Sequence, residues 1–326
     1  MGIYVKRSNL KGIDHQNKVV KFDPAKHGKI TGSRLLATLG KDEYTTEFKA
    51  ACLIARVCFD DTKTKETKAG EIIEPIIRGT LREKADTLLR DVLKVDGNID
   101  VEEPLSKEVC FYDHFHKEKV FGGMVDGYID LNRERYAILE IKTCGKRSIW
   151  FDEDGNRTIP PSYNLQASLY AELSGLEKIV FAVGFLEEKD YAHPELFVPT
   201  KDNTVVFAID KKDISQEMEQ AREWYARYIE SGKTPAWTEK DEPLVEILAT
   251  SDTIDNMPNE ARRLFKKYVR MMDSDEVSDL EYNLKEIMSE RAADGVKTVV
   301  YKVDGVTFSL SMENYKLTVI PDSIQN

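Results

Sequence analysis

The sequence is poor in cysteine and lacks any long apolar run. Its four cysteines, Cys52, Cys58, Cys110 and Cys144, form no CxxC pair, so neither a disulfide framework nor a structural zinc site is expected. No stretch approaches the roughly 18 apolar residues of a membrane-spanning helix, and the first residues lack the apolar segment of a signal peptide. These absences favour a soluble protein of a reducing cytoplasm with no membrane partner.

The chain also lacks an excess of positive charge. Its 47 Lys and Arg residues are outnumbered by 58 Asp and Glu residues, which gives a formal net charge of −11. This balance argues against broad, non-specific adhesion to nucleic acid. It does not exclude a nuclease, because a nuclease site is itself a cluster of carboxylates and because a local basic surface can grip DNA.

Hydrophobic periodicity divides the first two thirds of the chain into helices and strands. Helical spacing predicts helices over about 30–40, 46–59 and 71–93. β-Branched and aromatic residues then predict strands over 108–115, 119–131 and 136–142, with Asn132 to Arg135 as a turn. A helix over 162–174, strands over 178–186 and 204–209, and a helix over 213–231 follow. This order indicates a mixed β-sheet flanked by helices.

The pattern changes after Pro235. Apolar residues at helical spacing predict two charged helices, and a β-hairpin with an Asp304-Gly305 turn follows them. We therefore expect a main domain over 1–235 and a C-terminal helical and β-hairpin module over 236–326. The basic residues at 262, 263, 266, 267 and 270 can line a DNA path. An acidic run over 273–281 follows them directly. The pattern therefore fits a solvated helical hairpin or an oligomer contact at least as well as a DNA path.

The strand over 136–142 carries two charges on one face. Side chains alternate along a strand, so Glu140 and Lys142 share a face while Leu139 and Ile141 point to the other. With the turn at 132–135, Asp126 on the preceding strand lies roughly opposite Ile141 and Glu140. Two carboxylates and one ammonium are thus expected to converge, provided that the strand register holds.

Such a group suits the hydrolysis of a phosphodiester. Two neighbouring carboxylates repel each other unless a cation lies between them, and hard oxygen ligands suit Mg²⁺ or Mn²⁺. The metal would polarise the phosphate and activate water, while Lys142 would orient that water or offset the developing negative charge.

The same residues resemble a known nuclease family. Gly123 to Gly127, Leu139 to Thr143 and Gln166 to Tyr170 resemble, in order, the motifs of the PD-(D/E)XK nucleases with a QxxxY helix. Ile30 to Ser33 and Arg78 to Glu83 are similar to elements that precede the core in YqaJ-like and lambda-type phage recombination exonucleases. The resemblance covers about 29–209 and implies an α/β (α+β) fold with a restriction-endonuclease-like core.

The resemblance also implies roles for individual residues. Asp126 and Glu140 would be the main metal ligands, joined by Glu83 from a helix and by the carbonyl oxygen of Ile141. Lys142 would be the catalytic lysine, and Gln166 and Tyr170, one helical turn apart, would steady the lysine and the DNA end. The residue before the acidic motif is Val125, where the family's name-giving pattern has proline.

The function that the resemblance implies is a Mg²⁺-dependent exonuclease acting on linear double-stranded DNA in phage-type recombination or end resection. Its expected partners are DNA ends, a single-strand annealing protein and further copies of the chain, in the cytoplasm of a bacterium or phage-infected host. A restriction-type or structure-specific endonuclease, or a non-catalytic DNA-binding or assembly module, remains an alternative. The iron–sulfur, helicase-linked branch is disfavoured because no cysteine follows Cys144.

Each of these residues also has a plainer interpretation. Asp126 beside glycine can be a turn residue, and Glu140 with Lys142 can be a solvent-facing pair on an edge strand. His114 and His116 are two residues apart, which places both on one face of a strand. They lack a third ligand nearby, so we expect a structural or solvent-facing role. The ordered set, rather than any single residue, carries the nuclease interpretation.

Overall fold

The computed structural model describes residues 3–6, 9–60, 62–106, 110, 112–252, 259–271, 277–290, 292, 294–303 and 306–321. The chain folds into two compact units. The first, here called the sheet unit, comprises residues 29–43 and 62–224, and the second comprises residues 2–28, 44–61 and 225–326. The boundary expected near residue 235 between a main domain and a C-terminal module stays a prediction.

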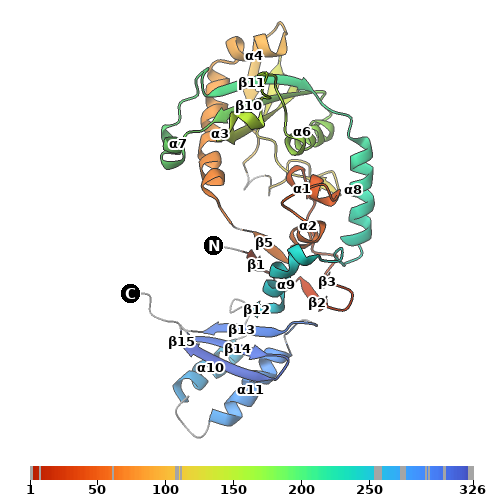
Figure 1. Cartoon of the computed structure of the whole chain (residues 1–326), viewed down its shortest axis with the longest axis vertical. Coiled ribbons are helices and arrows are strands. Elements are labelled where there is room, and N and C mark those ends of the chain that lie inside the picture. The colour runs from red at the N-terminus through yellow and green to blue at the C-terminus, as the bar shows by residue number, and fades with distance from the viewer. Residues whose placement is uncertain are drawn as a thin grey trace. The chain divides into compact units, whose positions relative to one another are not determined.

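The sheet unit is built on a five-stranded sheet of strand order β11-β10-β9-β8-β6. Figure 1 labels two of these strands, β10 and β11. β9 and β10 run parallel, and the other neighbours are antiparallel. The expectation of a mixed sheet flanked by helices is therefore confirmed. The strands are β6 (Ile99–Glu102), β8 (Gly127–Leu131), β9 (Glu134–Cys144), β10 (Lys178–Phe185) and β11 (Thr204–Asp210).

Two helices cover one face of this sheet. α3 (Lys65–Glu83) and α4 (Ala85–Leu93) meet at Lys84, and their apolar residues pack with Leu139, Ile141 and Val180 in a continuous core. Gly184 on β10 allows the close approach, because an added Cβ there would lie 3.0 Å from Cδ1 of Ile77. The core residues of β9 thus point toward α3 and α4, so Glu140 and Lys142 point to the other face.

The opposite face is covered by α6 (Pro161–Ser174), which also packs against α1 (Gly32–Thr38). Gly32 makes this contact possible, since a Cβ at that position would lie 2.6 Å from Cγ of Gln166. α6 ends at Gly175, which adopts φ of 69°, as expected for a helix C-cap glycine. The same face holds a cluster of rings in which Trp150 contacts Tyr163, Phe181 and Phe207.

Two expected strands differ from the structure. The prediction of a strand over 108–115 is wrong for residues 112–115, which contain a turn and a bend and no strand. Residues 108, 109 and 111 lie outside the described residues. The strand next to β8 is β6 instead. The strand expected over 119–131 is interrupted: β7 (Phe121–Gly122) pairs with β4 (Ile30–Thr31), and Gly123 then adopts φ of 133° before β8 begins. The remaining helices here are α7 (Glu188–Ala192) and α8 (Ser215–Tyr228).

The second unit contains the C-terminal elements and two N-terminal segments. The expected helices are present as α10 (Asn259–Met271) and α11 (Val277–Ser289), and they pack on the strands through a core that includes Phe265 and Phe308. The expected hairpin is β13 and β14, while its Asp304-Gly305 turn lies outside the described residues. The remaining elements are β1 (Ile3–Val5), β2 (Leu10–Asp14), β3 (Val19–Phe22), α2 (Glu47–Ile54), β5 (Cys58–Asp60), α9 (Glu242–Ala249), β12 (Thr250–Asp252), β13 (Thr298–Val303), β14 (Val306–Ser311) and β15 (Lys316–Pro321).

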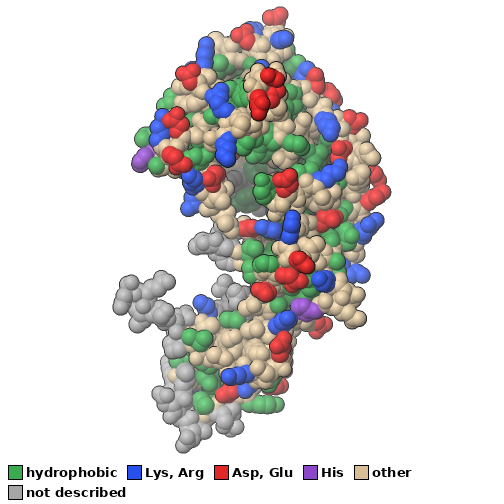
Figure 2. All heavy atoms as spheres, in the orientation of Figure 1, with side chains coloured by type: hydrophobic (Ala, Val, Ile, Leu, Met, Phe, Trp, Pro, Cys, Tyr) green, Lys and Arg blue, Asp and Glu red, His purple; other side chains and the backbone are tan. Residues whose placement is uncertain are grey.

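Acidic and basic side chains are interspersed over the face of the sheet unit that Figure 2 shows, with hydrophobic side chains between them. This distribution fits a chain whose net charge of −11 is spread over many elements. Within the described residues, no helix combines the length and the apolar composition that crossing a membrane requires.

Candidate active site

The hairpin of β8 and β9 sets the position of Asp126. Its turn consists of Asn132 and Arg133, which both have positive φ, so that Leu131 pairs directly with Glu134. A register shift at Ile129 and Asp130 then brings Gly127 opposite Leu139. Continued by one residue, this register places Asp126 opposite Glu140. Without the shift, Asp126 would lie opposite Leu139, and its side chain would belong to the other face.

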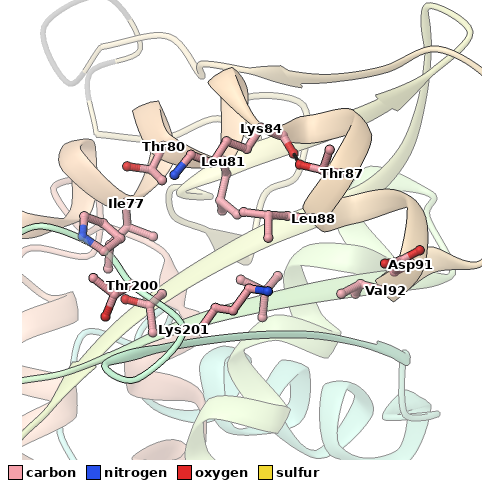
Figure 3. Close-up of a pocket in the computed structure, with 13 residues that line it drawn as sticks. Ile77, Thr80, Leu81, Lys84, Thr87, Leu88, Asp91, Val92, Thr200 and Lys201 are labelled. Carbon is pink, nitrogen blue, oxygen red and sulfur yellow. Dashed lines mark hydrogen bonds between the residues drawn. The ribbon is translucent and has the colours of Figure 1, made fainter.

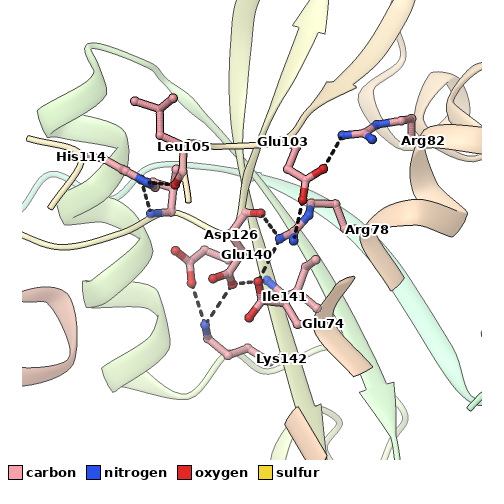
Figure 4. A network of polar contacts seen from close by, with 11 residues as sticks. Glu74, Arg78, Arg82, Glu103, Leu105, His114, Asp126, Glu140, Ile141 and Lys142 are labelled. Carbon is pink, nitrogen blue, oxygen red and sulfur yellow. Dashed lines mark hydrogen bonds and ion pairs between the residues drawn. The ribbon is translucent and has the colours of Figure 1, made fainter. Parts of the chain in front are cut away.

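Glu140 and Lys142 form an ion pair inside the sheet unit. Nζ of Lys142 lies 2.7 Å from Oε2 of Glu140, whose side chain is 0% exposed. The same Nζ lies 3.6 Å from Oδ2 of Asp126. The expected convergence of two carboxylates and one ammonium is therefore present (Figure 4).

Asp126 is held from two sides. Its Oδ2 accepts a hydrogen bond of 2.7 Å from the backbone N–H of Ile141, and its backbone carbonyl accepts one of 2.7 Å from Nη1 of Arg78. The carboxylate is thereby fixed against β9, while the backbone is fixed against α3. The first contact reduces the freedom of the side chain and the second that of the backbone, before any ligand binds.

The helix carboxylate beside Asp126 is Glu74, and the structure does not bring Glu83 to this group. Nη1 of Arg78 binds Oε1 of Glu74 at 2.9 Å as well as the carbonyl of Asp126. Glu83 is exposed at the last residue of α3. An α-helix turns about 100° and rises about 1.5 Å per residue. Over the nine residues from Glu74 to Glu83, this geometry places Glu83 on the opposite side of the helix and about 13 Å further along its axis.

Gln166 and Tyr170 lie on the face of α6 that meets the site. Nε2 of Gln166 donates a hydrogen bond of 3.2 Å to Oε2 of Glu140. The hydroxyl of Tyr170 accepts one of 3.2 Å from the backbone N–H of Gly32. Gln166 therefore contacts the carboxylate partner of the lysine, and Tyr170 links α6 to the start of α1.

Burial and like charges shift the pKa values of the acids. Burial raises the pKa of Glu140 from 4.5 to about 7, with Lys142 acting against this rise and Asp126 adding to it. Burial also raises the pKa of Glu74, again with a contribution from Asp126. For Lys142, burial acts to lower the pKa, but the attraction of Glu140 and Asp126 is larger and raises it. Lys142 therefore stays protonated. The carboxyl groups of Glu140, Glu74 and Asp126 repel one another when all of them are ionised.

The oxygen atoms around Glu140 are of the kind that bind a hard divalent cation. Within the described residues, Oε1 of Glu140 is buried and accepts no hydrogen bond, which is costly for a carboxylate oxygen. Asp126, Glu74 and the carbonyl of Ile141 add further hard oxygens, the ligand type of Mg²⁺ and Mn²⁺. As they stand, no three His, Cys, Asp or Glu side chains in the described part of the chain converge closely enough to hold a metal ion. The donor types thus fit a hard cation, and the single ammonium of Lys142 offsets part of their negative charge.

His114 supports the segment that leads to Asp126. Its Nδ1 accepts a hydrogen bond of 3.1 Å from the N–H of Val125, and its Nε2 lies 3.0 Å from the carbonyl oxygen of Leu105. Both ring nitrogens are occupied by backbone groups, which fits the structural role expected for this residue. His116 is exposed.

Sequence reasoning missed Glu74, and it noted Arg78 only as the first residue of a motif. The signal that was present is their i, i+4 spacing, which places a carboxylate and a guanidinium on one helix face. The apolar residues Ile73, Ile77 and Leu81 mark the neighbouring, buried side of α3. Glu74 therefore lies at the edge of the buried side, although the spacing alone does not set how that side is placed against the strands.

The family model of the YqaJ-like viral recombinase domain matches residues 21–177. An uncharacterized protein of Mycoplasma genitalium, MG373, is 33% identical over 251 residues, which are 65% of this chain and 85% of that protein. Its homolog in Mycoplasma pneumoniae is 31% identical over the same shares of the two chains.

Two solved structures are also similar. An alkaline exonuclease of Laribacter hongkongensis, LHK-Exo, in complex with dAMP has a TM-score of 0.42 at 17% identity, over 64% of this chain and 91% of that one. A phage-related exonuclease of Haemophilus somnus has a TM-score of 0.36 at 12% identity, over 63% of this chain and 95% of that one.

Proposed function

Since this chain belongs to the family of the mycoplasma MG373 proteins and carries a YqaJ-like viral recombinase domain, we propose that it is a divalent-metal-dependent deoxyribonuclease. Its proposed reaction is hydrolysis of phosphodiester bonds from the ends of linear double-stranded DNA. The observation that carries the proposal is the buried group in which Nζ of Lys142 lies 2.7 Å from Glu140 and 3.6 Å from Asp126.

The proposed metal ligands are Asp126, Glu140 and the carbonyl of Ile141, with Glu74 in the place that was expected for Glu83. Mg²⁺ or Mn²⁺ at such a site supplies charge neutralisation at the phosphate and activation of water. The support from this chain is the unpaired Oε1 of Glu140 and the uniformly hard oxygen donors around it.

The residues of the chain have separate tasks in this proposal. Lys142 stays protonated beside the phosphate, where its charge stabilises the negative charge that develops in the transition state. Gln166, which donates to Glu140, holds that carboxylate in its rotamer, and Arg78 fixes both the backbone of Asp126 and the side chain of Glu74. This preorganisation lowers the cost of aligning the reacting groups.

The proposed preference for duplex ends follows from the resemblance of the sequence motifs to phage recombination exonucleases and from the match to the YqaJ-like viral recombinase domain. The proposed setting is phage-type recombination or end resection in the cytoplasm of a bacterium or an infected host. An annealing protein and further copies of the chain stay predicted partners.

The test is a comparison of a linear duplex with a covalently closed circle of the same sequence, each incubated with and without Mg²⁺. We expect the labelled linear duplex to lose mononucleotides from its ends in Mg²⁺, while the circle stays intact. Asp126→Ala serves as the inactive variant, and its circular dichroism should match that of the parent.

Cutting of the closed circle would replace the exonuclease assignment by an endonuclease. Absence of cleavage on every substrate and with both metals would instead favour a non-catalytic DNA-binding module. Unchanged cleavage by Asp126→Ala would show that the catalytic residues lie elsewhere in the chain.

A further inference from the structure

A cavity of about 600 Å³ lies in the sheet unit, between α3 and α4 on one side and the segment 199–206 on the other (Figure 3). Its size falls in the range of small-molecule sites, roughly 300–1,000 Å³. The carboxylates of the candidate active site are not among the residues that line it. The cavity is therefore a separate feature of the fold.

One face of the two helices forms the first wall. Lining residues recur every three or four positions, which is the spacing of one helix face. They are Ile77, Thr80, Leu81, Lys84, Thr87, Leu88, Asp91 and Val92. Ile77 and Leu81 belong to the buried core, whereas Leu88 and Val92 are partly exposed, so the wall offers apolar surface to a ligand.

The second wall is a loop fixed by its own hydrogen bonds. The N–H of Thr200 donates to Oδ1 of Asn203 at 2.8 Å, and the N–H of Thr204 donates to the carbonyl of Thr200 at 2.9 Å. Nη1 of Arg147 holds the loop from outside through the carbonyl of Asp202 at 2.7 Å. This wall is thus formed before a ligand arrives, which reduces the entropic cost of binding.

Two lysines lie on opposite walls. Lys84 comes from the junction of α3 and α4 and Lys201 from the loop, and both line the cavity (Figure 3). Within the described residues, neither has an acidic partner within ion-pair distance, although nearby Lys178 is paired with Asp210 at 2.6 Å and Lys211 with Glu172 at 2.7 Å. In a chain of net charge −11, two unpaired lysines at one cavity indicate an anionic ligand.

The number and kind of donors favour a phosphate monoester. A phosphate monoester carries about −1.5 to −2 charges at neutral pH and can balance the charge of two ammonium groups, whereas the single charge of a carboxylate balances only one. Thr200 adds a hydroxyl, whereas the hydroxyls of Thr80 and Thr87 already donate to backbone carbonyls. Asp91 lies at the end of the cavity away from Thr80 (Figure 3). An amino or hydroxyl group of the ligand can donate to it there.

We propose that this cavity binds a small phosphate monoester with an apolar ring, of which a mononucleotide is the fitting example. Lys84 and Lys201 hold the phosphate, and Leu88, Val92 and Val206 contact the ring. The identification of mononucleotides as the source rests on the proposed function, since an exonuclease releases them. The chemistry of the cavity does not depend on it.

The test is calorimetric titration of the full chain with dAMP in EDTA, which removes metal-assisted binding at the carboxylates. Deoxyadenosine, which lacks the phosphate, and inorganic phosphate, which lacks the ring, form the comparison arms. We expect saturable binding of dAMP and at least tenfold weaker binding of either fragment. Equal binding of inorganic phosphate and dAMP would overturn the role of the ring, and equal binding of deoxyadenosine would overturn the role of the phosphate.

The variant Lys84→Ala/Lys201→Ala should weaken dAMP binding at least tenfold, while its unfolding temperature stays near that of the parent. The matched control is Lys146→Ala/Lys240→Ala, which removes the same charge from exposed positions outside the cavity. Absence of saturable dAMP binding, or equal binding by both double variants, would overturn the proposal. Because the titration involves no turnover, its failure is distinguishable from failure of the duplex cleavage assay.

Discussion

Nζ of Lys142 lies 2.7 Å from Oε2 of Glu140, a carboxylate whose side chain has no exposed surface. A buried ion pair of this kind is weak evidence for stability, because desolvation of both charges offsets much of their attraction. The pair is also incomplete, since Oε1 of Glu140 accepts no hydrogen bond from the part of the chain that the structure describes. The arrangement therefore adds little to folding stability, which fits the chemical role proposed for it.

Metal affinity should depend on pH through Glu140. Burial raises the pKa of this carboxyl from 4.5 to about 7, so below pH 7 it holds a proton that a cation must displace. Affinity for Mn²⁺ should therefore rise by about tenfold per pH unit from pH 5.5 to 7, and level off above pH 7, as expected for release of one proton. Calorimetric Mn²⁺ titrations at pH 5.5, 6.5, 7.5 and 8.5 measure this slope.

The control for this dependence is Glu140→Gln, which cannot ionise. Its weaker Mn²⁺ binding should lose most of the slope between pH 5.5 and 7. A parent protein whose affinity is constant over this range would contradict the assignment of the titrating ligand to Glu140.

The two glutamates of α3 should differ sharply in their effects. Glu74 shares Nη1 of Arg78 with the carbonyl of Asp126, whereas Glu83 is exposed on the other side of the helix. Glu74→Gln should lower Mg²⁺ affinity roughly 10- to 100-fold, the usual cost of losing a group that supports a metal site. Glu83→Gln should change cleavage by less than about twofold, as is usual for an exposed side chain without such contacts.

Release of nucleotide from labelled duplex over a range of Mg²⁺ concentrations measures both glutamate variants. The matched pair removes one carboxylate each from the same helix, so a general effect of charge cancels. A larger loss in Glu83→Gln than in Glu74→Gln would restore the assignment that the sequence resemblance suggested.

The convergence of Asp126, Glu140 and Lys142 could be predicted because its causes are local. Alternation along β9 fixes which side chains share a face, and a short turn fixes which residues of β8 lie opposite. The register shift at Ile129 and Asp130 leaves no mark in the residue types. The prediction used a four-residue turn over 132–135, and the structure has a two-residue turn followed by the register shift. The two differences nearly cancel, so the predicted partner of Asp126 on β9 is nearly the observed one.

The position of the α3 glutamate beside Asp126 could not be predicted in the same way. α3 carries several glutamates, and which of them meets the sheet depends on how the helix is rotated and shifted against the strands. That placement is set by tertiary contacts such as Ile77 against Gly184. The pairing of β6 with β8 is also a tertiary contact that residue types do not show. The sequence therefore predicted a strand over the aromatic-rich segment 108–115 and none at the short edge strand β6.

The charge of Lys142 should matter for catalysis more than for folding. Lys142→Met keeps the length of the side chain and removes the ammonium, which should lower kcat on the order of 10³-fold, as for loss of one strong transition-state contact. Glu140 is then left without its cation, but its raised pKa lets it take up a proton near neutral pH. Near-ultraviolet circular dichroism should thus stay close to that of the parent.

Lys146→Met is the matched control for Lys142→Met. Lys146 is exposed just after β9, so its loss should leave kcat within about twofold. A Lys142→Met variant that keeps the parental kcat would remove the lysine from the proposed mechanism, whatever the result for metal binding.

Gly123 should be essential for the approach of α6 to the acidic motif. Its φ of 133° is strained for any side chain, and an added Cβ would lie 2.4 Å from the hydroxyl oxygen of Tyr170. Gly155 provides the comparison, because its φ of 79° is also positive but nothing lies within 4 Å of an added Cβ. Gly155→Ala should cost about 1 kcal/mol in unfolding free energy, whereas Gly123→Ala should cost at least about 3 kcal/mol because overpacking adds to the strain.

Urea unfolding of both glycine variants measures the difference, and cleavage of linear duplex measures its consequence for the site. Displacement of Tyr170 also moves Gln166 on the same helix face, so Gly123→Ala should lose activity even under conditions where it stays folded. Equal unfolding free energies for the two variants would show that α6 does not depend on this contact. The geometry around Glu140 would then have to be held by the strands alone.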